Sequence, residues 1–206
     1  MAYFPFFMDL SSLDGLVVGG GRIALRKLQV LLPYGAKLTV AAPSFLPEVT
    51  RLPGLTKLTR YFCPALLEGR DYVIVASGDQ MLNRWIAALC RQRGVLVNVV
   101  DDRDACSFLF PALVRRGPLS IGISTGGASP TAAVYCKERI AQSLPDDFGD
   151  LLVYLAQLRE QVKTVLPGGV HREQSFARLF YACLEHGWPL DEAVITALLR
   201  AEEVPS

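Results

Sequence analysis

The sequence has no long hydrophobic run and almost no net charge. No apolar stretch reaches the roughly 18 residues that a membrane-spanning helix needs, so we expect no transmembrane helix. The 21 basic and 20 acidic residues leave a formal net charge of +1, which gives no electrostatic reason to expect nucleic acid or a membrane surface as a partner. The first ten residues also lack the basic segment and cleavage site that are typical of a signal peptide.

Histidines and paired cysteines are scarce as well. The two histidines, His171 and His186, are too far apart in the chain to form a local metal motif, and we predict no dedicated metal site. The cysteines include no C-x-x-C pair, and their odd number does not fit a disulfide framework. We expect reduced, mostly buried thiols in a cytoplasmic protein at all five positions: Cys63, Cys90, Cys106, Cys136 and Cys183.

A glycine-rich turn follows a short apolar run near the start of the chain. Gly19, Gly21 and Ala24 have the spacing G-x-G-x-x-G/A of a dinucleotide-binding turn. The first glycine permits the tight turn, the second lets a phosphate approach the backbone, and Ala24 is small enough where helix meets strand. Because the N–H groups of the new helix would face the phosphates, we predict that Gly19, Gly21, Arg22 and Ile23 bind the cofactor.

Apolar runs alternate with helical patterns through the first half of the chain. This alternation predicts the α/β class, with a Rossmann-like parallel sheet and right-handed connections. In such sheets, ligands bind beyond the carboxyl ends of the strands. Ser77 and Asn98 lie at two of these ends, and we predict that they bind the cofactor. The predicted strands are residues 16–18, 37–42, 58–62, 72–76 and 95–100, and the predicted helices are residues 22–32 and 83–93.

One residue that is typical of NAD sites is missing. Such sites carry an aspartate or glutamate at the end of the second strand, where it binds the ribose hydroxyls. Here Ala41 and Ala42 are followed by Pro43 and Ser44. We predict that Pro43 and Ser44 contact the adenosine ribose instead, so these residues leave the choice between NAD and NADP open.

The pattern changes after residue 106. Segments 107–114 and 119–124 predict two antiparallel strands, joined at residues 115–118, and we expect this hairpin to extend the parallel sheet. Ser129 suits a helix N-cap and Pro130 the first helical position, so a helix is predicted over residues 130–142, with an anion site at its start.

The two ends of the chain carry weaker signals. The aromatic residues of segment 3–10 are expected to pack into the core. After residue 145 we predict only helices, over residues 148–165, 173–185 and 190–202, with a break at 167–169.

Together these motifs resemble the precorrin-2 dehydrogenase and sirohydrochlorin ferrochelatase family, the N-terminal module of siroheme synthase. The resemblance covers residues 1–145, and the loop STGGASP with the strand VNVVD is more specific than the glycine turn. It implies NAD-dependent oxidation of precorrin-2 to sirohydrochlorin, with Fe²⁺ insertion to give siroheme in some relatives. The matching segments are FPFFMDL, VVGGGRIALRK, GAKLTVAAP, LVNVVDD, SFLFPALVRRGPLSIGISTGGASP and KERI.

The resemblance also implies a homodimer and a division of the chain. Residues 1–106 would form the Rossmann domain, residues 107–145 the dimerisation element and residues 146–206 a helical domain. The family's essential carboxylate corresponds to Asp101, which follows a buried strand and suits a base that takes a proton during dehydrogenation. Asp102 is expected to be a turn or capping residue.

A tetrapyrrole with eight acidic side arms needs N–H donors and positive charge around an apolar slot. The residues predicted to supply them are Thr125, Gly126, Gly127, Ser129, Arg115, Arg116 and Lys137.

Two alternatives stay open from the sequence. The first is a non-enzymatic dinucleotide sensor, in which the helical tail would relay cofactor binding to a partner protein. The missing acidic residue after the second strand favours this alternative. The second is a dehydrogenase that acts on a small substrate other than precorrin-2. Iron insertion is undecided, because His171, His186 and Cys106 are weak metal-ligand candidates and a buried thiol is the simpler role for Cys106.

Overall fold

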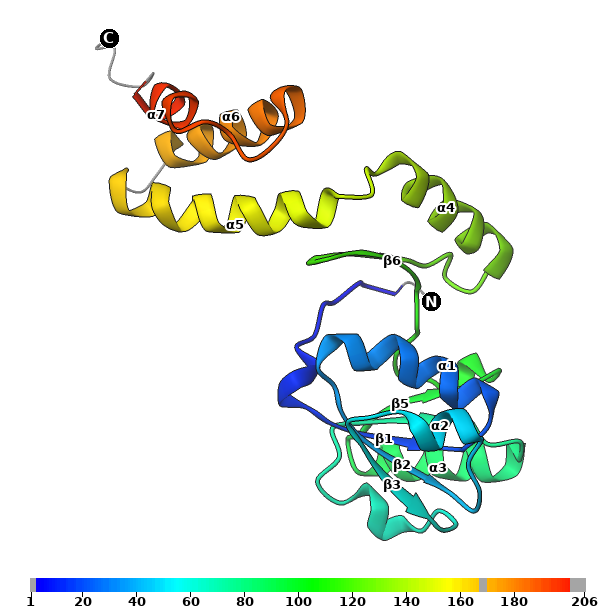
Figure 1. Cartoon of the computed structure of the whole chain (residues 1–206). Helices are drawn as coiled ribbons and strands as arrows, with labels where there is room; N and C mark the ends of the chain where they lie inside the picture. Colours follow the sequence, from blue (N-terminus) through cyan, green and yellow to red (C-terminus); the bar gives the residue numbers. More distant parts are fainter. Residues whose placement is uncertain (1–2, 167–169, 201–206) are drawn as a thin grey trace. The chain divides into compact units, whose positions relative to one another are not determined.

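The chain forms two compact units, residues 1–110 and 111–206, each with its own hydrophobic core. The structure is a computed structural model that describes residues 3–166 and 170–200. In Figure 1 the colours run from blue to green along the first unit and from green to red along the second.

The first unit is built on a five-stranded parallel sheet with the strand order β3-β2-β1-β4-β5. Its strands are β1 (Asp14–Val18), β2 (Lys37–Ala42), β3 (Leu55–Thr59), β4 (Tyr72–Val75) and β5 (Leu96–Val99). The helices are α1 (Arg22–Leu31), α2 (Pro47–Arg51) and α3 (Gln80–Gln92), with short 3-10 turns η1 (Leu10–Ser12), η2 (Leu32–Tyr34), η3 (Pro64–Leu67) and η4 (Arg103–Ala105). The predicted α/β class with a parallel Rossmann-like sheet and carboxy-terminal helices is therefore confirmed.

Helices cover both faces of this sheet, as Figure 1 shows for α1 and α3. Ala24 and Leu28 of α1 are fully buried against one face, and Ile86 and Cys90 of α3 are fully buried against the other. Burying a leucine such as Leu28 contributes about 1.5–3 kcal/mol. Central strands covered on both faces are apolar throughout, which explains why β4 was predictable as a continuous apolar run and the end of β1 as a short one.

The third strand lies three residues earlier than the predicted segment 58–62. Strand β3 pairs with β2 from Leu55 opposite Leu38 to Thr59 opposite Ala42. Because β2 ends at Ala42, nothing remains for Tyr61 to pair with, and its side chain is 77% exposed. The aromatic residues after β3 therefore gave a false strand signal.

The amino-terminal aromatic segment does not pack into the core, contrary to the prediction. Phe4, Phe6 and Phe7 are between 76% and 79% exposed. The described contact of this segment with the loop after β5 comes from Tyr3, whose hydroxyl oxygen accepts a hydrogen bond from Arg103 Nε at 3.4 Å.

The described part of the second unit contains a two-stranded antiparallel sheet followed by helices. Its elements are β6 (Ala112–Arg116), β7 (Leu119–Ile123), α4 (Pro130–Ser143), α5 (Phe148–Val165), α6 (Val170–His186) and α7 (Glu192–Arg200). The prediction of α5 was correct at both ends, and α4 is one residue longer than predicted. The predicted break at 167–169 and the last two residues of the predicted helix 190–202 lie outside the described residues.

The hairpin does not extend the parallel sheet, so this prediction was wrong. Ser107 occupies the open edge of β5: its N–H donates to Val97 O at 2.7 Å, and its hydroxyl oxygen accepts from Val97 N at 2.7 Å. The first strand of the hairpin consequently begins only at Ala112, and β6 and β7 form a sheet of their own.

The turn of the hairpin packs directly on the start of α5. Gly117 has a φ of 52°, and a Cβ added to Gly149 would lie 2.8 Å from Gly117 N, so both positions need glycine. An ion pair of 3.7 Å between Arg116 and Asp146 joins the same two segments. Helix α5 in turn packs on α6 and α7 around a buried cluster of Leu151, Val162, Leu179, Cys183 and Leu190.

Candidate functional site

The glycine turn after β1 is held by two close backbone approaches. Gly19 has a φ of 132°, and a Cβ at this position would lie 2.4 Å from the carbonyl oxygen of Ala76. A Cβ on Gly20 would lie 2.1 Å from the carbonyl oxygen of Ser44. A real Cβ has no room at either position, so both glycines are required by the fold itself. The need for Gly20 was not anticipated from the spacing pattern.

Gly21 is different, because a Cβ there would meet no atom within 4 Å. It is the N-cap of α1, has an extended backbone with φ −91° and ψ −170°, and caps the helix with no side-chain hydrogen bond. Arg22 and Ile23 follow it and are exposed. A helix start that has no side-chain cap and has open space at Gly21 suits a pyrophosphate. The residues present therefore fit the dinucleotide that the fingerprint predicts.

Pro43 and Ser44 lie beside this turn, at the carboxyl end of β2. Both are exposed, and the adjoining Leu46 N–H donates to Gly20 O at 2.9 Å. The Ser44 hydroxyl is thus at the edge of the sheet where the adenosine ribose is expected.

Ser77 lies after β4 and is half-buried. Its hydroxyl donates a short hydrogen bond to the side-chain oxygen of Asn83, whose amide nitrogen donates to Ser77 O at 3.1 Å. Asp79 caps α3 by accepting from Met81 N and Leu82 N at 2.9 and 3.0 Å. Asn83, which is buried and was not predicted as a site residue, therefore holds the backbone of this turn.

Asn98 is a buried residue of β5. Its side-chain amide donates to Phe108 O at 2.9 Å. Nearby, the Cys106 sulfur accepts from Val99 N at 3.1 Å and donates to Val99 O at 3.2 Å. Burial raises the pKa of the Cys106 thiol, which favours this protonated, hydrogen-bonded form. Asn98 and Cys106 together anchor the segment that follows β5, and direct contact of Asn98 with the cofactor stays a prediction.

Asp101 follows β5 in a left-handed backbone conformation with a φ of 60°. Among the described residues it is the one non-glycine residue with a positive φ, and its side chain is exposed. Aspartate tolerates this conformation better than most residues, and such outliers cluster at functional sites. Because β4 separates β5 from β1, the strand ends that precede Asp101 and the glycine turn are roughly 10 Å apart along the same edge of the sheet.

The neighbouring Asp102 has a structural role, as expected of a capping residue. Its carboxylate accepts from Arg84 Nε at 2.8 Å and from Ala105 N at 3.3 Å. The hydrogen bond from Arg84 holds the pKa of Asp102 below its ordinary value. Of the two adjacent carboxylates, Asp101 is therefore the one without a described hydrogen bond.

Lys27 is a residue that the sequence did not single out. It is half-buried on α1, and its ammonium nitrogen lies 3.7 Å from the centre of the Phe110 ring. Burial lowers the pKa of Lys27, while the nearby Cys106 and Asp101 raise it. Lys27 follows the buried Ala24 by three positions, so helical spacing already placed it at the border of the buried face.

The loop between β7 and α4 belongs to the second unit. The Thr125 hydroxyl donates to Ser129 O at 3.0 Å and accepts from Ser129 N at 3.2 Å. Ser129 caps α4 by accepting from Ala132 N at 3.1 Å, as predicted. Gly126 and Gly127 have φ values of 63° and 85°. The backbone of this loop is thus closed on itself in front of the helix start.

The basic residues predicted to bind substrate are also in the second unit. Arg115 and Lys137 are exposed. Arg116 is half-buried, pairs with Asp146, and its buried Nε has no hydrogen-bond partner. These positions are compatible with binding an anion, and their role stays a prediction.

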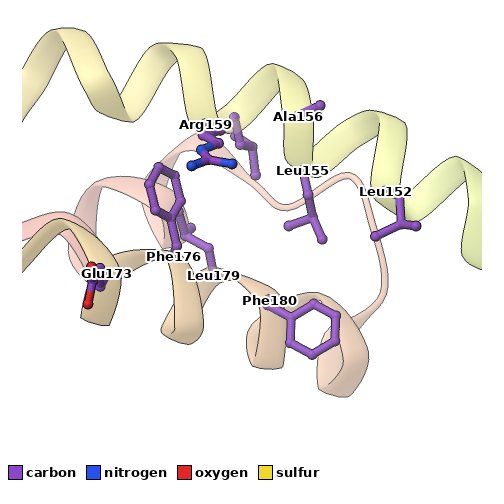
Figure 2. A pocket seen from close by; sticks show the side chains of 9 residues that line it. Leu152, Leu155, Ala156, Arg159, Glu173, Phe176, Leu179 and Phe180 are labelled. Carbon is purple, nitrogen blue, oxygen red and sulfur yellow. The ribbon is translucent and has the colours of Figure 1, made fainter. Parts of the chain in front are cut away.

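A cavity of about 510 Å³ lies between α5 and α6. None of the predicted site residues lines it. Figure 2 shows Leu152 and Leu155 of α5 facing Phe176 and Phe180 of α6, with Arg159 at one end. The guanidinium of Arg159 lies 5.6 Å from the centre of the Phe176 ring.

Within residues 3–166 and 170–200, no cluster of three or more histidine, cysteine, aspartate or glutamate side chains is arranged to hold a metal ion. His171 and His186 are both exposed. In the same residues, no helix combines the length and apolar character needed to cross a membrane.

Comparisons with known proteins agree with this geometry. A family model described as "Putative NAD(P)-binding" matches residues 6–112, and one described as "Sirohaem biosynthesis protein central" matches residues 116–143. The chain belongs to the siroheme synthase N-terminal family. Siroheme synthase of Methylococcus capsulatus is 42% identical over 170 residues, which are 81% of this chain. That of Chromobacterium violaceum is 36% identical over 208 residues, which are 98% of this chain.

The chain spans 36% and 43% of the lengths of these two siroheme synthases. A solved structure described as "SirC, precorrin-2 dehydrogenase" has the same fold over its whole length. The TM-score is 0.77 at 23% identity, covering 97% of this chain and 98% of that chain.

Proposed function

We propose that the chain catalyses the NAD-dependent oxidation of precorrin-2 to sirohydrochlorin in siroheme biosynthesis. The observation that carries the proposal is the strained, exposed Asp101 at the carboxyl end of β5, at the same sheet edge as the glycine turn. Support also comes from the similarity to siroheme synthases over most of the chain.

The cofactor would bind along the carboxyl ends of β1, β2 and β4. Its pyrophosphate would lie against Gly21 and the start of α1, with the adenosine beside Ser44 and the nicotinamide toward β5. NAD⁺ supplies the hydride acceptor of the reaction. Gly20 packs closely against Ser44, and this contact would hold the N–H groups of the turn in place for the phosphates before binding.

Asp101 would take the proton that leaves the substrate together with the hydride. Its carboxylate is exposed and has no described hydrogen bond, so it is accessible to a substrate and can accept a proton as a base does. Asp102 cannot take this role readily, because its carboxylate is hydrogen-bonded to Arg84. The substrate's acidic side arms would bind at Thr125, Gly126, Gly127, Ser129, Arg115, Arg116 and Lys137.

The proposal includes a homodimer formed through β6, β7 and α4. Support comes from α4, in which Ala133 is buried while Val134 and Tyr135 are 47% and 63% exposed. Such apolar exposure is typical of an interface. We also propose that Fe²⁺ is a second substrate, which the chain inserts into sirohydrochlorin to give siroheme. We further propose that the protein is cytoplasmic.

The dehydrogenase proposal is tested with Asp101→Asn. Asparagine tolerates a positive φ as aspartate does, so the variant removes the charge without forcing the backbone to move. We expect anaerobic conversion of precorrin-2 with NAD⁺ to fall by at least about 100-fold, the usual contribution of an acid–base group, while NAD binding is unchanged. Full activity of the variant would overturn the role of Asp101. Absence of conversion by the unchanged chain, with NAD still bound, would favour a dinucleotide sensor.

Iron insertion is tested separately, with sirohydrochlorin and Fe²⁺ in the absence of NAD. The proposal predicts siroheme formation faster than the protein-free background. A rate equal to the background would leave dehydrogenation as the activity of this chain.

A further inference from the structure

Lys27 combines features that a purely structural lysine rarely has. It lies on the side of α1 that faces the segment after β5, with its ammonium group 3.7 Å from the centre of the Phe110 ring. The side chain is half-buried. An ammonium group has three N–H donors and no acceptor, and within the described residues none of these donors has a hydrogen-bond or ion-pair partner. A partly desolvated cation in this position is suited to receive an anion.

The surroundings of Lys27 indicate which anion it would receive. Lys27 lies over the Phe110 ring, and Asn98 of β5 holds the same segment by donating to Phe108 O at 2.9 Å. Lys27 therefore lies beside the segment that follows β5, where Cys106 and Asp101 raise its pKa. The phosphates and the adenosine ribose are expected at the ends of β1 and β2, on the other side of β4. A cofactor phosphate is therefore a poorer match than a group on the substrate.

Apolar surface lies beside the ammonium group. The rings of Phe108 and Phe110 are 5.8 Å apart, and both side chains are half-buried. A positive charge over the Phe110 ring, with Phe108 beside that ring, suits a ligand that is itself a flat, apolar body with carboxylate arms. A tetrapyrrole polycarboxylate has this composition.

We propose that Lys27 binds a carboxylate arm of the tetrapyrrole next to Asp101, with the Phe110 ring beneath the ammonium group. The inference rests on the proposed function for the identity of the substrate. It adds Lys27 to the residues that are predicted to bind the substrate. By fixing one arm near Asp101, Lys27 would also set which edge of the macrocycle faces the base.

The test measures binding of sirohydrochlorin, the reaction product, by fluorescence quenching without NAD or turnover. Lys27→Met keeps an unbranched side chain that can pack on Phe110 but removes the charge. Loss of a charge-assisted hydrogen bond should weaken sirohydrochlorin binding by roughly 10-fold or more, whereas NAD binding should change less than about twofold. The matched control is Arg26→Met, which removes the charge of the adjacent, exposed residue and should leave both affinities unchanged.

Further arms separate this inference from a structural role and from the proposed function. Lys27→Arg keeps the positive charge and should recover most of the sirohydrochlorin binding that Lys27→Met loses. If circular dichroism shows that Lys27→Met is unfolded, Lys27→Gln is used as the uncharged variant instead. If the uncharged variant binds sirohydrochlorin as tightly as the unchanged chain does, the role of Lys27 is overturned and the proposed function is not affected. Absence of sirohydrochlorin binding by the unchanged chain would overturn both the inference and the proposed function.

Discussion

Replacing Gly19 and Gly21 separately by alanine should separate folding from cofactor binding. At Gly19 the backbone has a φ of 132°, and the new Cβ would lie 2.4 Å from Ala76 O. A left-handed backbone costs a non-glycine residue about 1–2 kcal/mol, and relieving an overlap with backbone typically costs about 1–3 kcal/mol more. We therefore expect Gly19→Ala to lower the free energy of unfolding of the first unit by roughly 2–5 kcal/mol.

Gly21→Ala should weaken cofactor binding and leave the stability of the first unit almost unchanged. The backbone there is extended, with φ −91°, and the added Cβ meets nothing within 4 Å. The free energy of unfolding should change by less than about 0.5 kcal/mol, or rise slightly because alanine restricts the unfolded chain. The methyl group would instead occupy the space that the pyrophosphate needs. NAD affinity should therefore fall by about 10-fold or more, equivalent to about 1.4 kcal/mol.

Urea unfolding followed by tryptophan fluorescence measures the free energy of unfolding. Calorimetric titration with NAD measures the affinity for the cofactor. A Trp188→Phe background leaves Trp85, which belongs to the first unit, as the reporter. Unchanged NAD affinity in Gly21→Ala would refute the placement of the pyrophosphate at the start of α1. Unchanged stability in Gly19→Ala would refute the close approach to Ala76.

Three further predictions concern the rest of the chain. Asp102→Asn should lower the urea midpoint at about pH 7, and this difference should shrink as the pH falls below the ordinary carboxyl pKa. Arg84 lowers the pKa of Asp102, so the contribution of Asp102 is complete above the ordinary carboxyl pKa and is lost as the pH falls through the lowered one; a difference that does not depend on pH would contradict this. Asn98→Ala should cost about 1–3 kcal/mol of unfolding free energy, because Phe108 O loses its donor; an unchanged urea midpoint would contradict this. Tyr135→Glu should convert the proposed dimer to a monomer in light scattering with an unchanged circular dichroism spectrum, and a dimer that persists would argue against an interface at α4.

The sequence predicted most strongly those elements that are buried on one or both faces. Both ends of strand β2 were predicted correctly because Leu38 to Ala42 are all buried. Both ends of α5 were predicted correctly because its apolar residues recur at helical spacing. The sequence failed where an element depends on a distant neighbour. Nothing local to residues 107–124 shows that Ser107 occupies the edge of β5, and this contact is what separates the hairpin from the sheet.

The candidate site was predictable to a similar extent. The glycine spacing identified Gly19 and Gly21, yet it did not distinguish the glycine that the fold requires from the one that leaves room for a ligand. Asp101 was found from its position after a buried strand and from the family resemblance, whereas its left-handed backbone is visible only in three dimensions. Lys27 was missed because a lysine on an amphipathic helix is usually solvated, and only the packing of Phe110 against it shows otherwise.

The most direct test of the account is the stoichiometry of the reaction under anaerobic conditions. The chain is mixed with precorrin-2 and NAD⁺, and the NADH and sirohydrochlorin formed are quantified together by absorbance. The account predicts one NADH for each sirohydrochlorin, because one hydride and one proton leave the substrate. Sirohydrochlorin formed without NADH, or no conversion by a chain that binds NAD, would contradict it.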